Sequence, residues 1–224
     1  MKPLLLTLYK YSNKILGLYG FRLNRVWPRT LNPNAFSLDT IRDCQLVPTR
    51  KDLLEKMPKN GSALELGVAS GDFSEEILRR LEPETLTLVD GWHQPGYLLD
   101  KKNIVEDRFE EEIRQGKIII HQRLSTEAVD LFPDNHFDFV YIDTDHTYET
   151  TKTELELYAT KVKPGAFLCG DDYTVGNVGS SLHYGVIAAV SEFCQENRWT
   201  LAMLSMEPYR PSSFALKKPS EGSE

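Results

Sequence analysis

Apolar residues recur with two different spacings between about residue 48 and residue 217. Short continuous apolar runs predict buried strands, and between them apolar residues return every three or four positions, which predicts amphipathic helices. The expected strands are residues 62–68, 85–92, 117–122, 137–143, 165–172, 199–206 and 212–218. The expected helices are residues 49–57, 72–81, 103–115, 125–132, 147–162 and 183–198.

The alternation of strands with helices indicates an α/β fold with a doubly wound, mostly parallel, seven-stranded sheet that is covered by helices on both faces. The last two strands are joined only by residues 207–212, so we expect them to form a C-terminal antiparallel hairpin. Sheets of this kind bind their ligands at the carboxyl ends of the strands. Polar residues in the loops after the strands are therefore the candidates for function.

The N-terminal part of the chain differs from the rest in charge. Residues 1–38 contain six basic residues and no acidic one, which leaves 20 basic and 33 acidic residues in 39–224. The apolar run at the start is too short and too often interrupted by lysine to span a bilayer, and it lacks the cleavage site of a secretory signal. We therefore divide the chain into a basic helical extension (1–47), a main domain (48–217) and a disordered tail (218–224).

The extension has two interpretations. Its apolar positions suit an amphipathic helix that binds an anionic membrane surface or a partner. The same helix could instead pack on the domain or on another subunit of a homo-oligomer, with its lysines in solvent. We expect a cytoplasmic protein, with contact to the inner face of the membrane under the first interpretation.

Composition narrows the function classes. A content of 41% hydrophobic and 26% charged residues is that of an ordinary globular protein, and a net charge of −7 argues against binding to a nucleic-acid backbone. The three cysteines are widely spaced and odd in number. This is neither a disulfide framework nor a zinc pattern, so a reducing compartment is expected.

A glycine loop follows the first expected strand. Glu65, Gly67 and Gly71 have the spacing E-x-G-x-x-x-G, and Asp72 opens the next helix. Glycine allows a sharp turn and a close approach by a ligand, but this spacing is not that of a dinucleotide site. Acidic groups here would repel a pyrophosphate and attract an ammonium or sulfonium group. The alternative is an ordinary strand–turn–helix connection.

Asp90 lies at the end of the second expected strand, 23 residues after Gly67. An acidic residue at this place can accept hydrogen bonds from ribose hydroxyls, although it could also cap the turn before Gly91. Taken together, the glycine loop and Asp90 indicate a nucleoside-containing ligand with a positive charge.

Four carboxylates follow two later strands. Asp143 and Asp145 end one strand, and Asp171 and Asp172 end the next. Two like charges about 4 Å apart at an effective dielectric of about 20 repel by roughly 4 kcal/mol, so such a cluster must take up protons, separate or bind a cation. Oxygen ligands suit Mg²⁺, Mn²⁺ or Ca²⁺. Alternatively, each aspartate caps a turn or helix, which is plausible for any one of them but poor for all four.

The motifs ELGVASGDFS, LVDGW, FDFVYIDTDHTYE and PGAFLCGDDY together resemble class I S-adenosylmethionine-dependent methyltransferases, and in particular the metal-dependent macrocin- and novobiocin-type sugar O-methyltransferases. The resemblance covers about residues 48–217 and implies a Rossmann-like sheet. The cofactor residues that it implies are Glu65, Gly67, Ser70, Gly71, Asp90, Ser125 and Asp143, with Asp90 at the ribose and Ser125 at the adenine. It also implies that Asp143, Asp171 and Asp172 hold Mg²⁺ or another divalent cation and that Asp145 is the base.

His146 departs from the sugar-enzyme pattern, in which an aromatic or aliphatic residue tends to follow the second aspartate. The histidine could act as the base in place of Asp145, or ligate a softer metal. The expected function is methylation of a hydroxyl of a sugar, glycan or related small molecule, with S-adenosylmethionine as cofactor and a divalent ion assisting. Two alternatives stay open: a metal-independent methyltransferase with His146 as base, and a non-catalytic protein that organises a membrane or glycan-assembly complex.

Overall fold

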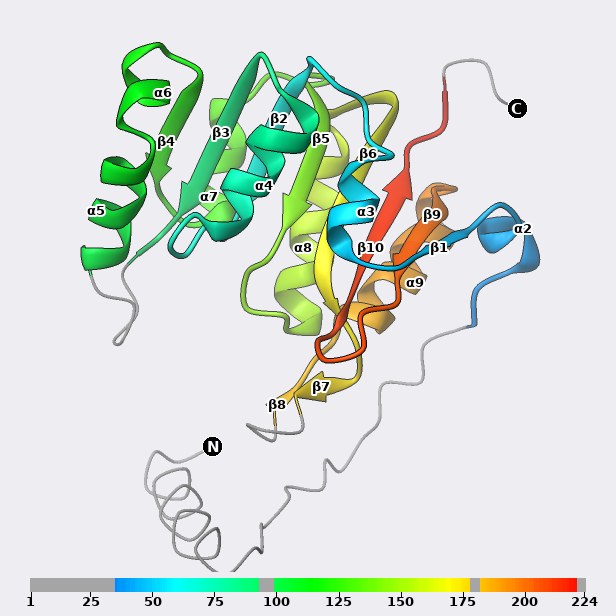
Figure 1. Ribbon diagram of the computed structural model, residues 1–224. Coiled ribbons are helices and arrows are strands. Elements are labelled where there is room, and N and C mark those ends of the chain that lie inside the picture. The colour runs from blue at the N-terminus through cyan, green and yellow to red at the C-terminus, as the bar shows by residue number, and fades with distance from the viewer. Residues whose placement is uncertain (1–34, 93–98, 178–181, 221–224) are drawn as a thin grey trace, which may run out of the picture.

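An eight-stranded sheet with helices on both faces forms the core of the computed structural model, which describes residues 35–92, 99–177 and 182–220 (Figure 1). The strands are β1 (Gln45–Val47), β2 (Ser62–Leu66), β3 (Thr85–Asp90), β4 (Ile118–Gln122), β5 (Phe137–Ile142), β6 (Val162–Tyr173), β9 (Thr200–Ser205) and β10 (Ser212–Lys217). A separate ribbon pairs β7 (Gly176–Asn177) with β8 (Leu182–His183). The helices are α2 (Leu38–Ile41), α3 (Arg50–Leu54), α4 (Asp72–Leu81), α5 (Leu99–Arg108), α6 (Glu110–Arg114), α7 (Ser125–Ala128), α8 (Tyr148–Ala159) and α9 (Val186–Asn197), with a 3-10 turn at Val129–Leu131.

The strand order is β1-β9-β10-β6-β5-β2-β3-β4, and only β10 runs antiparallel to its neighbours. The predicted α/β class, the mostly parallel sheet and the closing antiparallel hairpin of β9 and β10 are confirmed. All seven expected strands are present, and β1 adds an eighth beside β9. Strand β1 and helix α2 are too short to leave a readable pattern in the sequence.

Alternate side chains of the strands pack into two hydrophobic layers. On one face Leu54 of α3 and Ile77 of α4 pack with Phe139 of β5. On the other face Leu155 of α8 and Val190 of α9 pack in the cluster that contains Val140 and Leu168. Figure 1 shows α3 and α4 in front of the sheet and α8 and α9 behind it. This double cover explains why the central strands read as continuous apolar runs.

Several expected helices differ in extent from their predicted ranges. The segment 125–132 consists of α7 and the 3-10 turn, and α9 begins three residues later than expected because His183 belongs to β8. The segment 103–115 is divided at Phe109 into α5 and α6, and α3 is little more than one turn that begins at the capping residue Thr49. The hydroxyl of Thr49 accepts a hydrogen bond from the backbone N–H of Asp52, as expected for a helix N-cap.

The parallel strands end at the same edge of the sheet, which is the lower edge in Figure 1. Gly67 lies there with φ +86°, and a Cβ added to it would be 1.9 Å from the carbonyl oxygen of Asp143. This glycine is therefore required because the loop after β2 touches the loop after β5. The contact brings two of the predicted motifs together.

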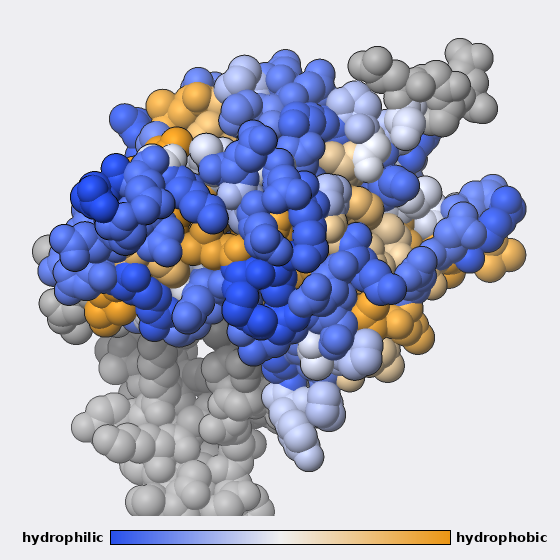
Figure 2. Space-filling view, turned by 45° about the horizontal axis from the view of Figure 1, so that its top comes forward, coloured by the Kyte–Doolittle hydropathy of each residue, from blue (hydrophilic) through white to orange (hydrophobic). Residues whose placement is uncertain are grey.

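The structure also bears on the expectations about location. Cys44, Cys169 and Cys194 are all free thiols. Among the described helices, none is both long and apolar enough to cross a membrane. Figure 2 shows one face of the molecule, on which the surface is mostly hydrophilic and hydrophobic residues form separate small patches. Of the expected extension only residues 35–47 are described, so the amphipathic helix predicted before them lies outside the described residues, as do 221–224 of the expected tail.

Candidate functional site

A cleft of about 540 Å³ opens at the carboxyl ends of the strands. Six residues that the sequence singled out line it: Gly67, Asp90, Ser125, Asp143, Asp145 and His146. They come from the loops after β2, β3, β4 and β5, which are distant in sequence. The sheet topology therefore brings the glycine loop, the acidic strand end and part of the carboxylate group to one cavity.

Asp90 fastens the glycine loop. Its Oδ2 accepts hydrogen bonds from the backbone N–H groups of Val68 and Ala69, both at 2.9 Å, and its Oδ1 accepts one from Trp92 at 2.8 Å. The indole N–H of Trp92 in turn donates to the carbonyl oxygen of Ala69 at 2.9 Å. Because a carboxylate oxygen can accept more than one hydrogen bond, Oδ1 can still accept from a ligand.

Glu65, Ser70 and Gly71 are not among the residues that line the cleft. Glu65 is 1% exposed and lies between the sheet and α4, where the hydroxyl of Ser74 bonds to its carboxyl group. Burial raises the pKa of Glu65 from 4.5 to about 8. The carboxyl group is therefore mostly protonated near neutral pH, so it does not supply the negative charge that the sequence argument assigned to it.

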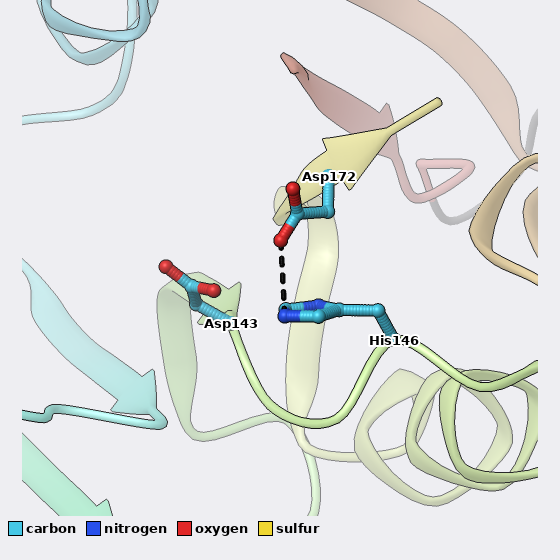
Figure 3. A group of neighbouring side chains, drawn as sticks. All are labelled: Asp143, His146 and Asp172. Carbon is cyan, nitrogen blue, oxygen red and sulfur yellow. Dashed lines mark ion pairs between the residues drawn. The ribbon is translucent and has the colours of Figure 1, made fainter. Parts of the chain in front are cut away.

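Three side chains form a compact group at the ends of β5 and β6 (Figure 3). One possible ligand atom each from Asp143, His146 and Asp172 lies within 4.8 Å of the other two, and His146 Nε2 is 3.0 Å from Asp172 Oδ2. His146 and Asp172 both have left-handed backbone conformations, with φ of 60° and 54°. Such conformations in residues other than glycine are costly and are found preferentially at functional sites.

The charges in this group are strongly coupled. Burial, followed by the negative charges of Asp171 and Asp172, raises the pKa of Asp143 well above its ordinary range. Burial lowers the pKa of His146, but the hydrogen bond and charge of Asp172, with the charges of Asp143 and Asp171, raise it overall. The group thus favours a bound proton or another cation.

Asp171 does not join this group, although the sequence predicted it as a metal ligand. Its side chain is buried, Oδ2 accepts hydrogen bonds from Arg50 at 3.1 Å and from Arg210, and Oδ1 accepts one from the hydroxyl of Ser213 at 2.8 Å. Arg50 also lies 4.0 Å from Asp143. At Asp171, therefore, arginines of the chain itself supply the positive charge that balances the carboxylate.

Asp145 lines the cleft but is also held at the start of α8. Its Oδ1 accepts hydrogen bonds from the backbone N–H and the hydroxyl of Thr147, and its Oδ2 accepts one from the hydroxyl of Thr150, each at 3.0 Å. Asp145 therefore caps the turn before α8, whereas the N-cap of the helix itself is Thr147. Its role as base stays a prediction.

Glu154 of α8 is a cleft residue that the sequence analysis missed. It is fully buried, and it accepts hydrogen bonds from Ser125 at 2.5 Å and from Thr144 at 2.8 Å. Ser125 is the first residue of α7, and Leu124 is the capping residue of that helix. The sequence did contain a signal that Glu154 is buried, because it has helical spacing with Thr151 and Tyr158, which are buried in α8. Tyr184, whose ring centroid is 4.9 Å from that of His146, was also missed.

Comparison with protein families finds one match over this part of the chain. Residues 64–173 match the model of a family described as a methyltransferase domain. The matched region runs from β2 to the end of β6, so it contains all the motifs discussed above. A search of curated proteins finds no match.

Several solved structures share the fold. An O-methyltransferase family protein from Burkholderia thailandensis is 12% identical with a TM-score of 0.57, over 77% of this chain and 56% of that longer one. A SAM-dependent methyltransferase from Aquifex aeolicus is 11% identical with a TM-score of 0.56, over 80% of this chain and 91% of that one. A precorrin-6y C5,15-methyltransferase from Geobacter metallireducens is 12% identical with a TM-score of 0.54, over 76% and 86%. At these identities the similarity establishes the Rossmann-like methyltransferase fold.

Proposed function

We propose that this protein is an S-adenosylmethionine-dependent O-methyltransferase that acts on a hydroxyl group of a sugar, glycan or related small molecule, with assistance from a divalent metal ion. The observation that carries the proposal is the cleft itself. The region matches a methyltransferase domain. The cleft is bordered on the one hand by the glycine loop, which is hydrogen-bonded to Asp90, and on the other by the group of Asp143, His146 and Asp172.

The cofactor would occupy the part of the cleft beside Gly67 and Asp90. The free acceptor capacity of Asp90 Oδ1 suits a ribose hydroxyl. Asp90 and Asp145 line the same cavity, and carboxylates favour a positively charged sulfonium over a neutral thioether. This preference matches the direction of the reaction, in which the sulfonium loses its charge.

The acceptor would lie next to Asp143, His146 and Asp172. These side chains fit a divalent ion, because two carboxylates and an imidazole are common metal ligands and their donor atoms are close together. An ion held there would lower the pKa of the acceptor hydroxyl. The imidazole widens the choice from Mg²⁺ to softer ions such as Mn²⁺. The ligand set differs from the predicted one, with His146 in place of Asp171.

The residues of the chain then have three tasks. They align the acceptor oxygen with the methyl carbon, hold the cationic cofactor and accept the hydroxyl proton. As the oxygen–carbon bond forms, the carbon–sulfur bond breaks. The proton passes to Asp145 where His146 ligates the ion, or to His146 where no ion takes part. Positioning supplies much of the rate enhancement in such a transfer.

A second candidate is metal-independent transfer with His146 as the base. The 3.0 Å contact between His146 Nε2 and Asp172 favours it, because a carboxylate at one ring nitrogen orients the imidazole and leaves the other nitrogen for the acceptor. Both candidates use the same cleft and the same cofactor.

Calorimetric titration with S-adenosylmethionine tests the common part of the proposal. The wild-type protein should bind the cofactor, and Asp90→Ala should weaken binding at least about tenfold, since it removes both a ligand contact and the anchor of the glycine loop. Glu127→Ala, an exposed change on α7, is the control. Absence of binding by the wild-type protein would overturn the proposal.

Transfer of a labelled methyl group to a panel of sugars, glycans and catechols then separates the two candidates. Metal-assisted transfer predicts loss of activity in excess EDTA and its recovery with Mg²⁺ or Mn²⁺. Full activity in EDTA, together with loss of activity in His146→Ala, would select the metal-independent enzyme.

A further inference from the structure

Glu154 places a carboxyl group on a helix face that is otherwise buried against the hydrophobic core, so packing alone does not explain it. It belongs to the buried face of α8 with Leu155 and Tyr158, is 0% exposed, and nevertheless borders the cleft. A buried carboxyl group destabilises a protein unless it has hydrogen-bond partners. The partners of Glu154 are two hydroxyl groups from different loops that both line the cavity.

The two partners lie on different loops. Ser125 follows β4, the edge strand, whereas Thr144 follows β5, and strands β2 and β3 lie between them in the sheet. Each carboxyl oxygen of Glu154 accepts from one of these hydroxyls. A second hydrogen bond connects α8 with the loop after β4, because the hydroxyl of Tyr158 donates to the carbonyl oxygen of Ser125 at 2.7 Å.

We propose that Glu154 is a positioning residue that ties the loop after β4 to the loop after β5 and so sets the width of the cofactor end of the cleft. The inference rests on the proposed function, because the ligand whose fit it sets is the cofactor. Glu154 would act through Ser125 and Thr144. Loss of the link would let the two walls separate and weaken cofactor binding.

The electrostatics of Glu154 indicate which substitution should preserve the link. Burial raises its pKa to about 7, while the hydrogen bonds from Ser125 and Thr144 and the charge of His146 lower it and the charge of Asp145 raises it. The carboxyl group is therefore partly protonated near neutral pH. Glutamine, which has one acceptor and one donor group at the same positions, resembles the protonated form and can bond to both hydroxyls.

Calorimetric titration with S-adenosylhomocysteine measures the effect. Glu154→Met, which fills the space without polar atoms, should weaken binding at least about tenfold, whereas Glu154→Gln should stay within about threefold of the wild type. The matched control is Glu156→Gln on the same helix, where the side chain is 52% exposed. If Glu154 only stabilised the fold, Glu154→Met would lower the unfolding temperature, but the affinity for S-adenosylhomocysteine would not be lost in Glu154→Met and kept in Glu154→Gln.

A second measurement applies even if Glu154→Met fails to fold. Ser125→Ala and Thr144→Val each remove one half of the link. With Glu154 present, the loss of affinity in the double variant should therefore differ strongly from the sum of the losses in the two single variants. If the wild-type protein does not bind S-adenosylhomocysteine, the proposed function is wrong. If it binds and the two effects simply add, or Glu154→Met binds like the control, the proposed function stands and the role of Glu154 is wrong.

Discussion

Replacement of Glu65 by glutamine should make the protein more stable at alkaline pH. Glu65 is 1% exposed, its bonding partner is the hydroxyl of Ser74, and burial raises its pKa from 4.5 to about 8. Glutamine has nearly the same size and can bond to the same hydroxyl. The substitution therefore removes one titration and leaves the packing between β2 and α4 in place.

The sign follows from the raised pKa. The unfolded chain releases the proton near pH 4.5 and the folded chain only near pH 8, so the contribution of Glu65 to stability is fully present below pH 4.5 and is lost as the pH rises to about 8. At about 1.4 kcal/mol for each pKa unit, the total loss is roughly 5 kcal/mol. About 2 kcal/mol of this is lost between pH 6 and pH 8.

Urea unfolding of both proteins at pH 6, 7 and 8 measures this difference. The free energy of unfolding of Glu65→Gln minus that of the wild type should rise by about 2 kcal/mol over this range. Glu127→Gln, on the exposed surface of α7, should show no such trend. A difference between Glu65→Gln and the wild type that does not change with pH would refute the reasoning, because it would mean that Glu65 does not titrate in this range.

Asp171→Asn should lower the free energy of unfolding by about 3–5 kcal/mol in urea titrations, because it leaves Arg50 and Arg210 without their buried carboxylate; a change below about 1 kcal/mol would contradict this account. Calorimetric titration with Mn²⁺ should show tighter binding to the wild type than to Asp172→Asn by at least about tenfold, while folded Asp171→Asn retains binding. Gly67→Ala should abolish cofactor binding in calorimetry, since its Cβ would collide with the loop after β5; binding at wild-type affinity would show that the loops move apart freely.

The fold could be predicted from the sequence because its signals are local. Continuous apolar runs and helical spacing mark each main strand and helix, and both arise from residues that are neighbours in the chain. Strand β1 could not be seen in this way, because its three residues form a strand only by pairing with β9, more than 150 residues later. A pattern of that length carries no periodicity.

The site could be predicted only in part. The parallel topology makes the convergence of Asp90, Asp143 and His146 on one edge foreseeable, because each lies at the end of a strand or within four residues after it. The environment of Asp171 was not foreseeable, since the two arginines that bind it come from α3 and from the connection between β9 and β10. Asp171 and Asp172 are neighbours in one motif, yet they have different partners. Only the tertiary structure shows which of them contacts arginine and which contacts His146.

Strand β1 affects where this protein can be shortened. A chain that begins at residue 48 would retain every motif and yet lose the neighbour of β9, including the hydrogen bond from the backbone N–H of Met206 to the carbonyl oxygen of Val47. The exposed edge of β9 would then offer unpaired backbone groups to other molecules, and such edges promote aggregation. Poor solubility of that shortened chain would reflect an open sheet edge and would say nothing about the chemistry of the cleft.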